Sequence, residues 1–502
     1  MKFCKVADIA DWNDPEFQAI AQLLGLEGFQ NRKVWEHLQV YRGLQHLGLL
    51  TADSKALGLG VGRERIIYAL ANVCGSVVAT DLYNSPNWQT AALSPSEVYE
   101  QNPFPYARNR LVVQHMDMTQ IAFPDDSFDF VWSCCAIEHV NNFQELHQVY
   151  REIHRVLKPG GIAALTTEYN ATDRHSYEPN MLFTDRHWIE HWLTRKNPLV
   201  QGFELLDTPD LTLTPDPGNE PQPRRTQLKT AIPIFSRDIV LNSVSFFLRK
   251  SGVFARDYEE SWLDPAVRLY LSTCDRQRLQ DHEGAIQGFQ KLVQDSSLDS
   301  RLRVAAAHHL LVLLRSSAPQ AAIACARAVF ADCCQDENSD HLLPIAHQFK
   351  KLGLWDEAKR LYERIEHLAG ARDVQVVRSL LGQAECFAQQ GEWQRALELA
   401  ERAYQSLPVY RVTEEGTTVN YHRGVYYEKL GRWHEAITAY QQAIAAAAPA
   451  SKLQEKCKLR LAHCQEALSQ GVLNQNSKRQ LVPQRLKTWF NQFQQSIASE
   501  KH

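Results

Sequence analysis

The chain has 502 residues, 44% hydrophobic and 22% charged, with a formal net charge of −4. This length exceeds a single ordinary core and indicates two or three domains. The nearly balanced charge gives no reason to expect a nucleic-acid partner or an anionic membrane surface.

The first residues and the cysteine spacing indicate the cellular compartment in which the protein is expected. Asp8, Asp11 and Asp14 lie where a signal peptide needs an apolar core, and no later stretch offers about 18 uncharged apolar residues for a transmembrane helix. The eleven cysteines include no C-x-x-C pair. Reduced thiols therefore fit better than disulfides or a zinc site, and we predict no metal. We expect a soluble cytoplasmic protein.

Short apolar runs alternate with helical patterns as far as residue 250. Before them, apolar side chains at three- and four-residue spacing predict one amphipathic helix over 15–50, which caps a sheet. The first five of the six runs are separated by polar or amphipathic segments, as in a parallel sheet covered by helices. The predicted strands are 55–60, 76–81, 128–133, 162–169, 203–207 and 242–250.

The segment 208–235 is rich in Pro, Thr and Asp, which cannot sustain a helix or a central strand. A loop of this length is either disordered or a functional cover.

A repeated helix-pair pattern replaces the strands after about residue 262. The motif G-x-W-x-x-A begins at Gly353, Gly391 and Gly431, at intervals of 38 and 40 residues. In such a unit Gly ends the first helix and permits the turn, while Ala lets the second helix approach closely. The pattern resembles the tetratricopeptide repeat, which implies a helical solenoid over 262–470 that binds a protein partner.

The sharpest chemical signal follows the first predicted strand. Gly58, Gly60 and Gly62 lie at the strand end and a helical stretch follows, so backbone N–H groups can approach a ligand at the helix N-terminus. The spacing does not fit a dinucleotide fingerprint, because Arg63 and Arg65 stand where glycine is required. A nucleoside-type ligand without phosphate is therefore favoured.

Two acidic residues come at the end of, or after, later apolar segments. Asp81 ends the second predicted strand, where a carboxylate can accept two hydrogen bonds from a ribose diol. Asp117 follows the apolar segment 110–114 and could accept from an exocyclic amine. The segments FPDDSFDFVWS (123–133) and REIHRVLKPGGIAALT (151–166) come after them in order.

With these segments in this order, residues 50–170 resemble the class I S-adenosylmethionine-dependent methyltransferases, in the branch of small-molecule and lipid-type methylases. The resemblance implies a Rossmann-like, doubly wound α/β sheet and S-adenosyl-L-methionine as cofactor. It implies that Gly60 and Gly62 pass beneath the methionine part of the cofactor and that Asp81 holds the ribose hydroxyls. Asp117 with Met118 would bracket the adenine.

The glycine loop departs from the family pattern, acidic-x-G-x-G-x-G. The acidic position is Gly58, which cannot supply a carboxylate, and the last glycine is Glu64. We therefore expect Glu64 to contact the charged methionine end of the cofactor. The alternative is an acid at a helix N-terminus, which the helix dipole favours.

Glu138 and His139 follow the strand predicted at 128–133, at the mouth of the expected crevice. A hydroxyl or amine acceptor loses a proton on methylation, which invites a general base. His139 is the candidate base or acceptor-orienting residue, with Glu138 beside it, unless the pair only packs at the start of the next helix. Glu168 is a candidate for acceptor contact, and Arg32 for closing over the cofactor.

The predicted organisation is a helical cap (1–50), a methyltransferase domain (51–255), tetratricopeptide-type repeats (262–470) and a C-terminal helix or tail (471–502). The favoured function is methyl transfer to a small molecule, glycan or lipid-type acceptor, with the repeats recruiting a protein partner. One alternative is a protein methyltransferase that holds its substrate in the repeats. The other is a non-catalytic cofactor-binding scaffold, which Gly58 and Glu64 leave open.

Overall fold

The computed structural model describes residues 1–83, 92–172, 182, 184–194, 200–222, 230–236, 238–254, 263–368, 370–407, 414–447 and 451–469. The chain forms two compact units, Met1–Cys386 and Phe387–His502. The predicted C-terminal helix or tail (471–502) lies outside the described residues. Within the described part, no helix has both the length and the apolar character needed to cross a membrane.

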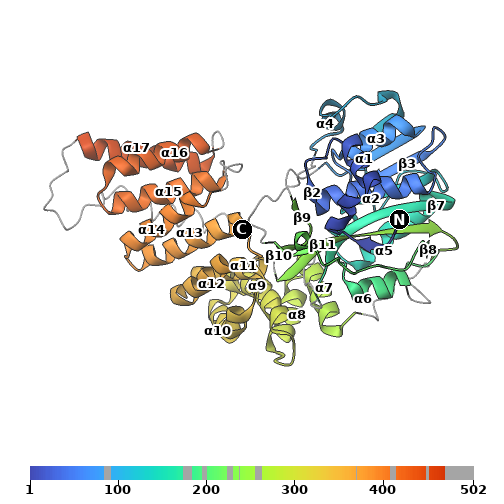
Figure 1. Ribbon diagram of the computed structural model, residues 1–502. Coiled ribbons are helices and arrows are strands. Elements are labelled where there is room, and N and C mark those ends of the chain that lie inside the picture. The colour runs from blue at the N-terminus through green and yellow to red at the C-terminus, as the bar shows by residue number, and fades with distance from the viewer. Residues whose placement is uncertain are drawn as a thin grey trace. The chain divides into compact units, whose positions relative to one another are not determined.

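A nine-stranded mixed sheet forms the core of the first unit (Figure 1). Its strands are β1 (Lys5–Val6), β3 (Lys55–Leu59), β4 (Ser76–Asp81), β5 (Leu111–His115), β6 (Phe128–Cys134), β7 (Leu157–Asn170), β8 (Phe203–Leu205), β10 (Ile234–Ser236) and β11 (Ile239–Lys250). The order is β1-β11-β7-β6-β3-β4-β5, and β8 and β10 also pair with β11. The five strands from β3 to β7 pair in parallel, whereas β11 runs antiparallel to β7.

Helices cover both faces of this sheet and create two apolar cores. One face is covered by α1 (Pro15–Leu23), α2 (Arg32–His46) and α3 (Arg65–Val73), and the other by α5 (Phe143–Val156) and α6 (Arg186–Ile189). Successive residues of β3 alternate between the two, with Ala56 in the first core and Leu57 in the second. Burial on both faces explains why the central strands are continuous apolar runs. The predicted doubly wound α/β fold is confirmed.

The prediction of one helix over 15–50 was wrong, because two helices occupy this stretch. Pro15 opens α1 and the Asp14 side chain caps it by accepting from the Glu16 N–H. The chain then turns at Gly25, which has a φ of +62°. The Asn31 side chain begins α2 by accepting from the Val34 N–H. A left-handed residue of this kind ends a helix whatever the apolar spacing beyond it.

The run predicted at 203–207 is not a fifth parallel strand. It forms only β8, three residues long and antiparallel to β11. The chain leaves the sheet at Asp207, whose carboxylate accepts from the N–H groups of Phe3 and Cys4 at 2.7 Å each. The following segment also packs against the N-terminus, because Asn219 Nδ2 donates to Asp8 Oδ1 at 2.8 Å. The described part of 208–235 is therefore a packed cover over the N-terminal segment, and 223–229 lie outside the described residues.

In the described part of the chain after residue 263, every element is a helix, as the repeat pattern predicts. In the first unit they are α7 (Pro265–Arg278), α8 (His282–Gln294), α9 (Ser300–Ser317), α10 (Pro319–Gln335), α11 (Ser339–Lys351) and α12 (Trp355–His367). Helix α13 (Asp373–Gln389) reaches the boundary between the units. In the second unit they are α14 (Trp393–Gln405), α15 (Glu414–Lys429), α16 (Trp433–Ala446) and α17 (Lys452–Ser469).

The residues of the repeated motif have the roles that their types predict. Gly353, Gly391 and Gly431 have φ values of +79°, +81° and +72°, and each lies just before the second helix of a pair. The alanines Ala358, Ala396 and Ala436 are fully buried. Two tyrosines downstream of the motif, Tyr362 and Tyr440, fill the space against a neighbouring helix. A Cβ added at Gly382 would lie 2.4 Å from the ring of Tyr362, and one added at Gly424 would lie 2.5 Å from that of Tyr440.

Candidate active site

The loop between β3 and α3 requires glycine at two positions. Gly60 and Gly62 have φ values of +65° and +45°, in the region that side chains disfavour. A Cβ at Gly60 would lie 2.4 Å from the Cβ of Ala136, just beyond β6. The loop thus passes close to the end of the neighbouring strand and leads into α3, whose first N–H groups are available to a ligand.

Gly58 is a glycine for a different reason. It lies within β3, and an added Cβ would be 2.4 Å from the indole of Trp132 on β6. This packing accounts for the glycine without any ligand, and the contact of Gly58 with a cofactor stays a prediction.

The Asp81 carboxylate joins the end of β4 to the glycine loop. The Gly62 N–H donates to Oδ2 of Asp81 at 2.9 Å, and the Tyr83 N–H donates to Oδ1 at 3.3 Å. Each carboxylate oxygen has a second lone pair, so Asp81 can still accept hydrogen bonds from a diol. The two backbone donors fix the carboxylate at the carboxyl edge of the sheet, where doubly wound folds bind their ligands.

Asp117 and Met118 follow β5, the strand that pairs with β4 and ends the strand order of the sheet. The N–H and the hydroxyl of Thr119 both donate to Oδ1 of Asp117 at 2.8 Å. Met118 Cε lies 3.4 Å from the Cβ position of Gly60. The structure therefore brings Met118 to the glycine loop, with Asp117 as its neighbour in the chain.

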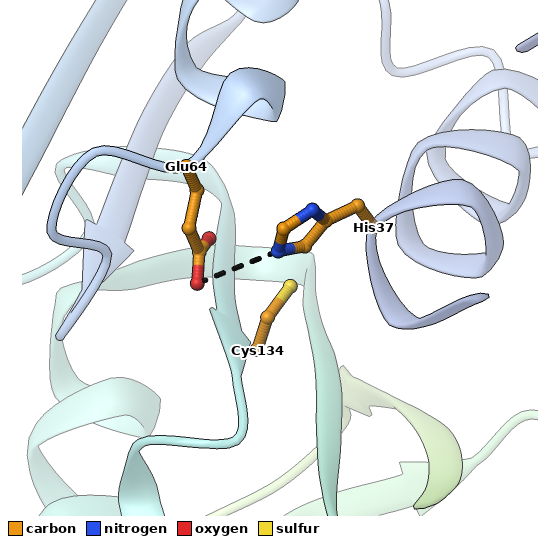
Figure 2. A group of neighbouring side chains, drawn as sticks. All are labelled: His37, Glu64 and Cys134. Carbon is orange, nitrogen blue, oxygen red and sulfur yellow. Dashed lines mark ion pairs between the residues drawn. The ribbon is translucent and has the colours of Figure 1, made fainter. Parts of the chain in front are cut away.

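Glu64 stands at the N-cap position of α3, but its side chain makes no capping hydrogen bond within the described part of the chain. The residue is 3% exposed, and burial raises the pKa of its carboxyl group. Its Oε1 lies 3.7 Å from Nε2 of His37 on α2, as Figure 2 shows. Its Oε2 is buried and has no hydrogen-bond partner among the described residues. Glu64 thus lies at a helix N-terminus, as the alternative expects, but it is buried and makes no capping hydrogen bond among the described residues.

Charged side chains of α2 lie over the same edge of the sheet. Arg32 Nη2 donates to Glu168 Oε1 on β7 at 2.7 Å, and Arg32 Nη1 lies 3.6 Å from Glu36 Oε1. Lys33 Nζ lies 3.9 Å from the same Glu168 oxygen. Buried charges of this kind need partners, and Arg32 and Glu168 satisfy each other. Each charge is therefore partly neutralised by the other before any ligand binds.

Glu138 and His139 occupy the 3-10 turn η3 (Ile137–His139) after β6. Glu138 is 1% exposed, and its Oε1 accepts from the Glu168 N–H at 3.0 Å. Its Oε2 is buried without a partner in the described structure, and burial raises the pKa of its carboxyl group. His139 is half-buried. The pair does not cap α5, because the Asn142 side chain accepts from the Glu145 N–H there.

Two residues of this region, Cys134 and His37, were not identified from the sequence. Cys134, at the end of β6, lies in a group with the buried Glu64 and the half-buried His37 (Figure 2). The strand-end position of Cys134 was the available signal, since the carboxyl ends of parallel strands share one edge. For His37 the sequence held no signal, because the face that α2 presents to the sheet depends on tertiary packing.

Two stretches of the chain match known protein families. Residues 57–165 match the methyltransferase domain family, and residues 424–454 match the tetratricopeptide repeat family. The chain therefore combines a methyltransferase domain with tetratricopeptide repeats, as its sequence predicts.

The relatives found are small-molecule and sterol methylases. A sterol 24-C-methyltransferase of Aspergillus fumigatus is 29% identical over 229 residues, which are 43% of this chain and 51% of that protein. The 27-O-demethylrifamycin SV methyltransferase of Amycolatopsis mediterranei is 31% identical over 112 residues, 22% of this chain and 36% of that protein. The chain thus spans about half or less of the length of these relatives.

Solved structures resemble the chain more distantly. A putative sarcosine dimethylglycine methyltransferase from Galdieria sulphuraria has a TM-score of 0.30 and 18% identity, and the match covers 43% of this chain and 84% of that one. Phosphoethanolamine N-methyltransferase 2 of Haemonchus contortus, solved with S-adenosyl-L-methionine, has a TM-score of 0.24 and 24% identity over 30% and 34% of the two chains.

Proposed function

We propose that the protein is an S-adenosyl-L-methionine-dependent methyltransferase. The observation that carries the proposal is Asp81, which the Gly62 N–H holds at the carboxyl edge of the sheet beside a loop that only glycine can form. The cofactor would supply a methyl group on a positively charged sulfur, already activated for displacement. The protein then has to bind the cofactor and the acceptor, align them and exclude water.

Each part of this ligand has a fitting group in the chain. Asp81 retains acceptor capacity for the two ribose hydroxyls, and Asp117 with Met118 would bracket the adenine. The backbone at Gly60 and Gly62, both at positive φ, would pass beneath the methionine part. The buried Oε2 of Glu64 has no hydrogen-bond partner among the described residues, which supports the proposal that this carboxyl group receives the cofactor's ammonium group in place of the acid missing at position 58.

Glu138 is the better placed of the two candidate bases. A catalytic carboxyl group near neutral pH needs a raised pKa, which burial gives to Glu138. The Glu168 N–H fixes one oxygen and leaves Oε2 for the acceptor's proton. We propose that Glu138 takes the proton and that His139 orients the acceptor.

We propose a small-molecule or lipid-type acceptor, because the relatives named above are methylases of sterols and of a rifamycin. The tetratricopeptide repeats would bind a partner protein, since stacked helix pairs expose extended surfaces that suit this role.

Calorimetry on the full chain with S-adenosylmethionine, and with its demethylated product, tests the cofactor. Asp81→Ala should weaken binding by about 2–3 kcal/mol, the value of two hydrogen bonds to a carboxylate. Asp53→Ala is a matched control, because Asp53 is exposed just before the opposite end of β3 and should leave binding unchanged. A folded wild type that gives no heat with either ligand would overturn the proposal.

Incubation of the full chain with labelled cofactor and fractionated lipids and metabolites tests turnover. Transfer of label to a lipid or small molecule supports the acceptor class. Label in a protein would instead indicate the protein methyltransferase, and binding without transfer would indicate the scaffold.

A further inference from the structure

We propose that His37, Glu64 and Cys134 form a binding site for a divalent transition-metal ion of the zinc type, and that the metal excludes the cofactor. The metal site stands independently, whereas the competition rests on the proposed function, in which Glu64 receives the methionine end. The sequence predicted no metal because the three residues are far apart in the chain and form no spacing motif.

The distances between the ligand atoms of the three side chains suit a metal ion after small side-chain rotations. One ligand atom from each residue lies within 4.8 Å of the other two, and His37 Nε2 is 3.7 Å from Glu64 Oε1. Bonds of zinc to nitrogen, oxygen and sulfur are about 2.0–2.3 Å, so two ligands of a tetrahedral ion are roughly 3.3–3.8 Å apart. The His37 Nε2 to Glu64 Oε1 separation of 3.7 Å exceeds the roughly 3.3–3.5 Å expected for a nitrogen–oxygen pair on zinc by about 0.2 Å.

Three separate elements hold the ligands, as Figure 2 shows. His37 lies on α2, Glu64 at the start of α3, and Cys134 at the end of β6. Each element packs into the same apolar core, through Leu38, Ile66 and Phe130 respectively. Ligands on rigid elements keep their mutual geometry better than ligands on a loop.

The group has unused polar capacity and an unbalanced charge. Within the described residues, His37 Nδ1 and Glu64 Oε2 are buried and have no hydrogen-bond partner. The Glu64 carboxyl group is buried, and its Oε1 lies 3.7 Å from His37 Nε2, so its charged form is costly without a closer partner. A divalent ion bound to one carboxylate, one thiolate and a neutral imidazole leaves no net charge. The ion replaces the thiol proton of Cys134, which passes to solvent.

The ligand types select the metal class. A mixed set of nitrogen, oxygen and sulfur suits zinc or cobalt and not calcium or magnesium, which take oxygen ligands. Three protein ligands leave a fourth position open for water.

A second group of similar composition lacks this unused capacity. Glu428, His463 and Cys464 also come together, in the second unit. There, Oε2 of Glu428 already accepts from the Tyr440 hydroxyl and from Arg460, each at 2.9 Å. Its charge is satisfied, so Cys464 provides a matched cysteine control.

Cobalt titration of the full chain tests the metal site. Co²⁺ bound to a thiolate gives a charge-transfer absorption band in the near ultraviolet, and tetrahedral Co²⁺ gives strong visible bands. We expect both with wild type and with Cys464→Ser, and neither with Cys134→Ser. The His37→Gln variant should weaken binding at least tenfold. A folded wild type without the thiolate band, or Cys134→Ser with the wild-type band, would overturn the metal site.

Cofactor calorimetry in the presence of Zn²⁺ tests the competition. We expect Zn²⁺ to weaken S-adenosylmethionine binding to wild type at least tenfold, a chelator to restore it, and Cys134→Ser to abolish the Zn²⁺ effect. Metal bound with unchanged cofactor affinity would overturn the competition. A wild type that binds Co²⁺ and no cofactor would instead overturn the proposed function and leave the metal site standing.

Discussion

The indole of Trp132 lies against the backbone of Gly58, so that a Cβ at position 58 would be 2.4 Å from ring atom Cζ2. Both residues are in the centre of the sheet, where β3 pairs with β6 and Gly58 is in register with Trp132. The tryptophan therefore occupies the space that a side chain at position 58 would need. The contact with Trp132 therefore accounts for glycine at position 58, where the family pattern has an acid.

Gly58→Asp alone should be destabilising, although it restores the family residue. It inserts a carboxylate against a buried ring, and overpacking with an unpaired buried charge costs about 2 kcal/mol or more. Denaturant unfolding measures the change. Gly28→Asp is the control, because a Cβ at Gly28 meets nothing within 4 Å. Trp132→Leu should recover part of the loss in the double variant, and strict additivity would show that the two positions do not compete for space.

The raised pKa of Glu64 predicts that this residue makes the protein less stable as pH rises. Its folded-state pKa lies above its unfolded value of about 4.3, so the folded state holds the proton more tightly. Stability relative to Glu64→Gln should therefore fall from about pH 4.3 upward and level off above the folded-state pKa, by about 1.4 kcal/mol for each unit of pKa shift. Thermal unfolding of both proteins across pH measures the difference.

The exposed residue Glu27 provides the control for this experiment. The difference between wild type and Glu27→Gln should stay flat over the same range. A Glu64→Gln difference that is also flat, or in which wild type gains stability relative to the variant as pH rises, would contradict the burial at position 64 of a carboxyl group whose Oε2 has no partner among the described residues.

The predicted domain boundary near residue 255 can be tested with the fragment 1–255. We expect it to fold and to bind cofactor, because every proposed cofactor residue lies within it. It loses Arg301, whose Nη1 lies 3.2 Å from Oδ2 of the buried Asp238. The fragment should therefore be destabilised, and Asp238→Asn should restore part of the loss by removing the unpaired charge. A soluble, cooperatively folding fragment without cofactor binding would show that the repeats complete the site.

Ala396→Leu tests the repeat geometry. Ala396 is fully buried on α14, so a larger side chain must separate the helices, at a cost of about 1–3 kcal/mol. In a solenoid this damage spreads mainly to neighbouring repeats. Hydrogen exchange should show lost protection near residue 396, and calorimetry should show cofactor affinity within about twofold of wild type. Lost protection in 55–170 would contradict the separation of the two functions. Arg395→Leu, at a neighbouring exposed position, is the control.

The sequence predicted the parts of the fold that are buried on both sides. The run SVVATD forms β4 over the same residues, because a strand between two helical layers must be continuously apolar. Strand β5 was absent from the predicted strands. It lies at the sheet edge, and its Val112 is 47% exposed, so it gives only a weak apolar signal.

The site was predictable where it follows strand ends. Gly60, Gly62, Asp81 and Met118 come together because parallel strands bring their carboxyl ends to one edge. The contacts of Arg32 and His37 on α2 were less predictable, because they depend on how a helix outside the parallel strands packs across that edge. The repeats were predicted from Gly353, Gly391 and Gly431 because the left-handed turn that each makes is a local backbone requirement.

The pairing of β1 with β11 sets an order of events during synthesis. Val6 pairs with Val244, so the first strand of the chain has no partner until almost all of the sheet has been translated. At about 5–20 residues per second this delay is on the order of 10–50 s. During that time α1 and α2 emerge from the ribosome with the apolar faces that later cover the sheet. A nascent chain of this protein should therefore depend on chaperones until residue 250 has been made.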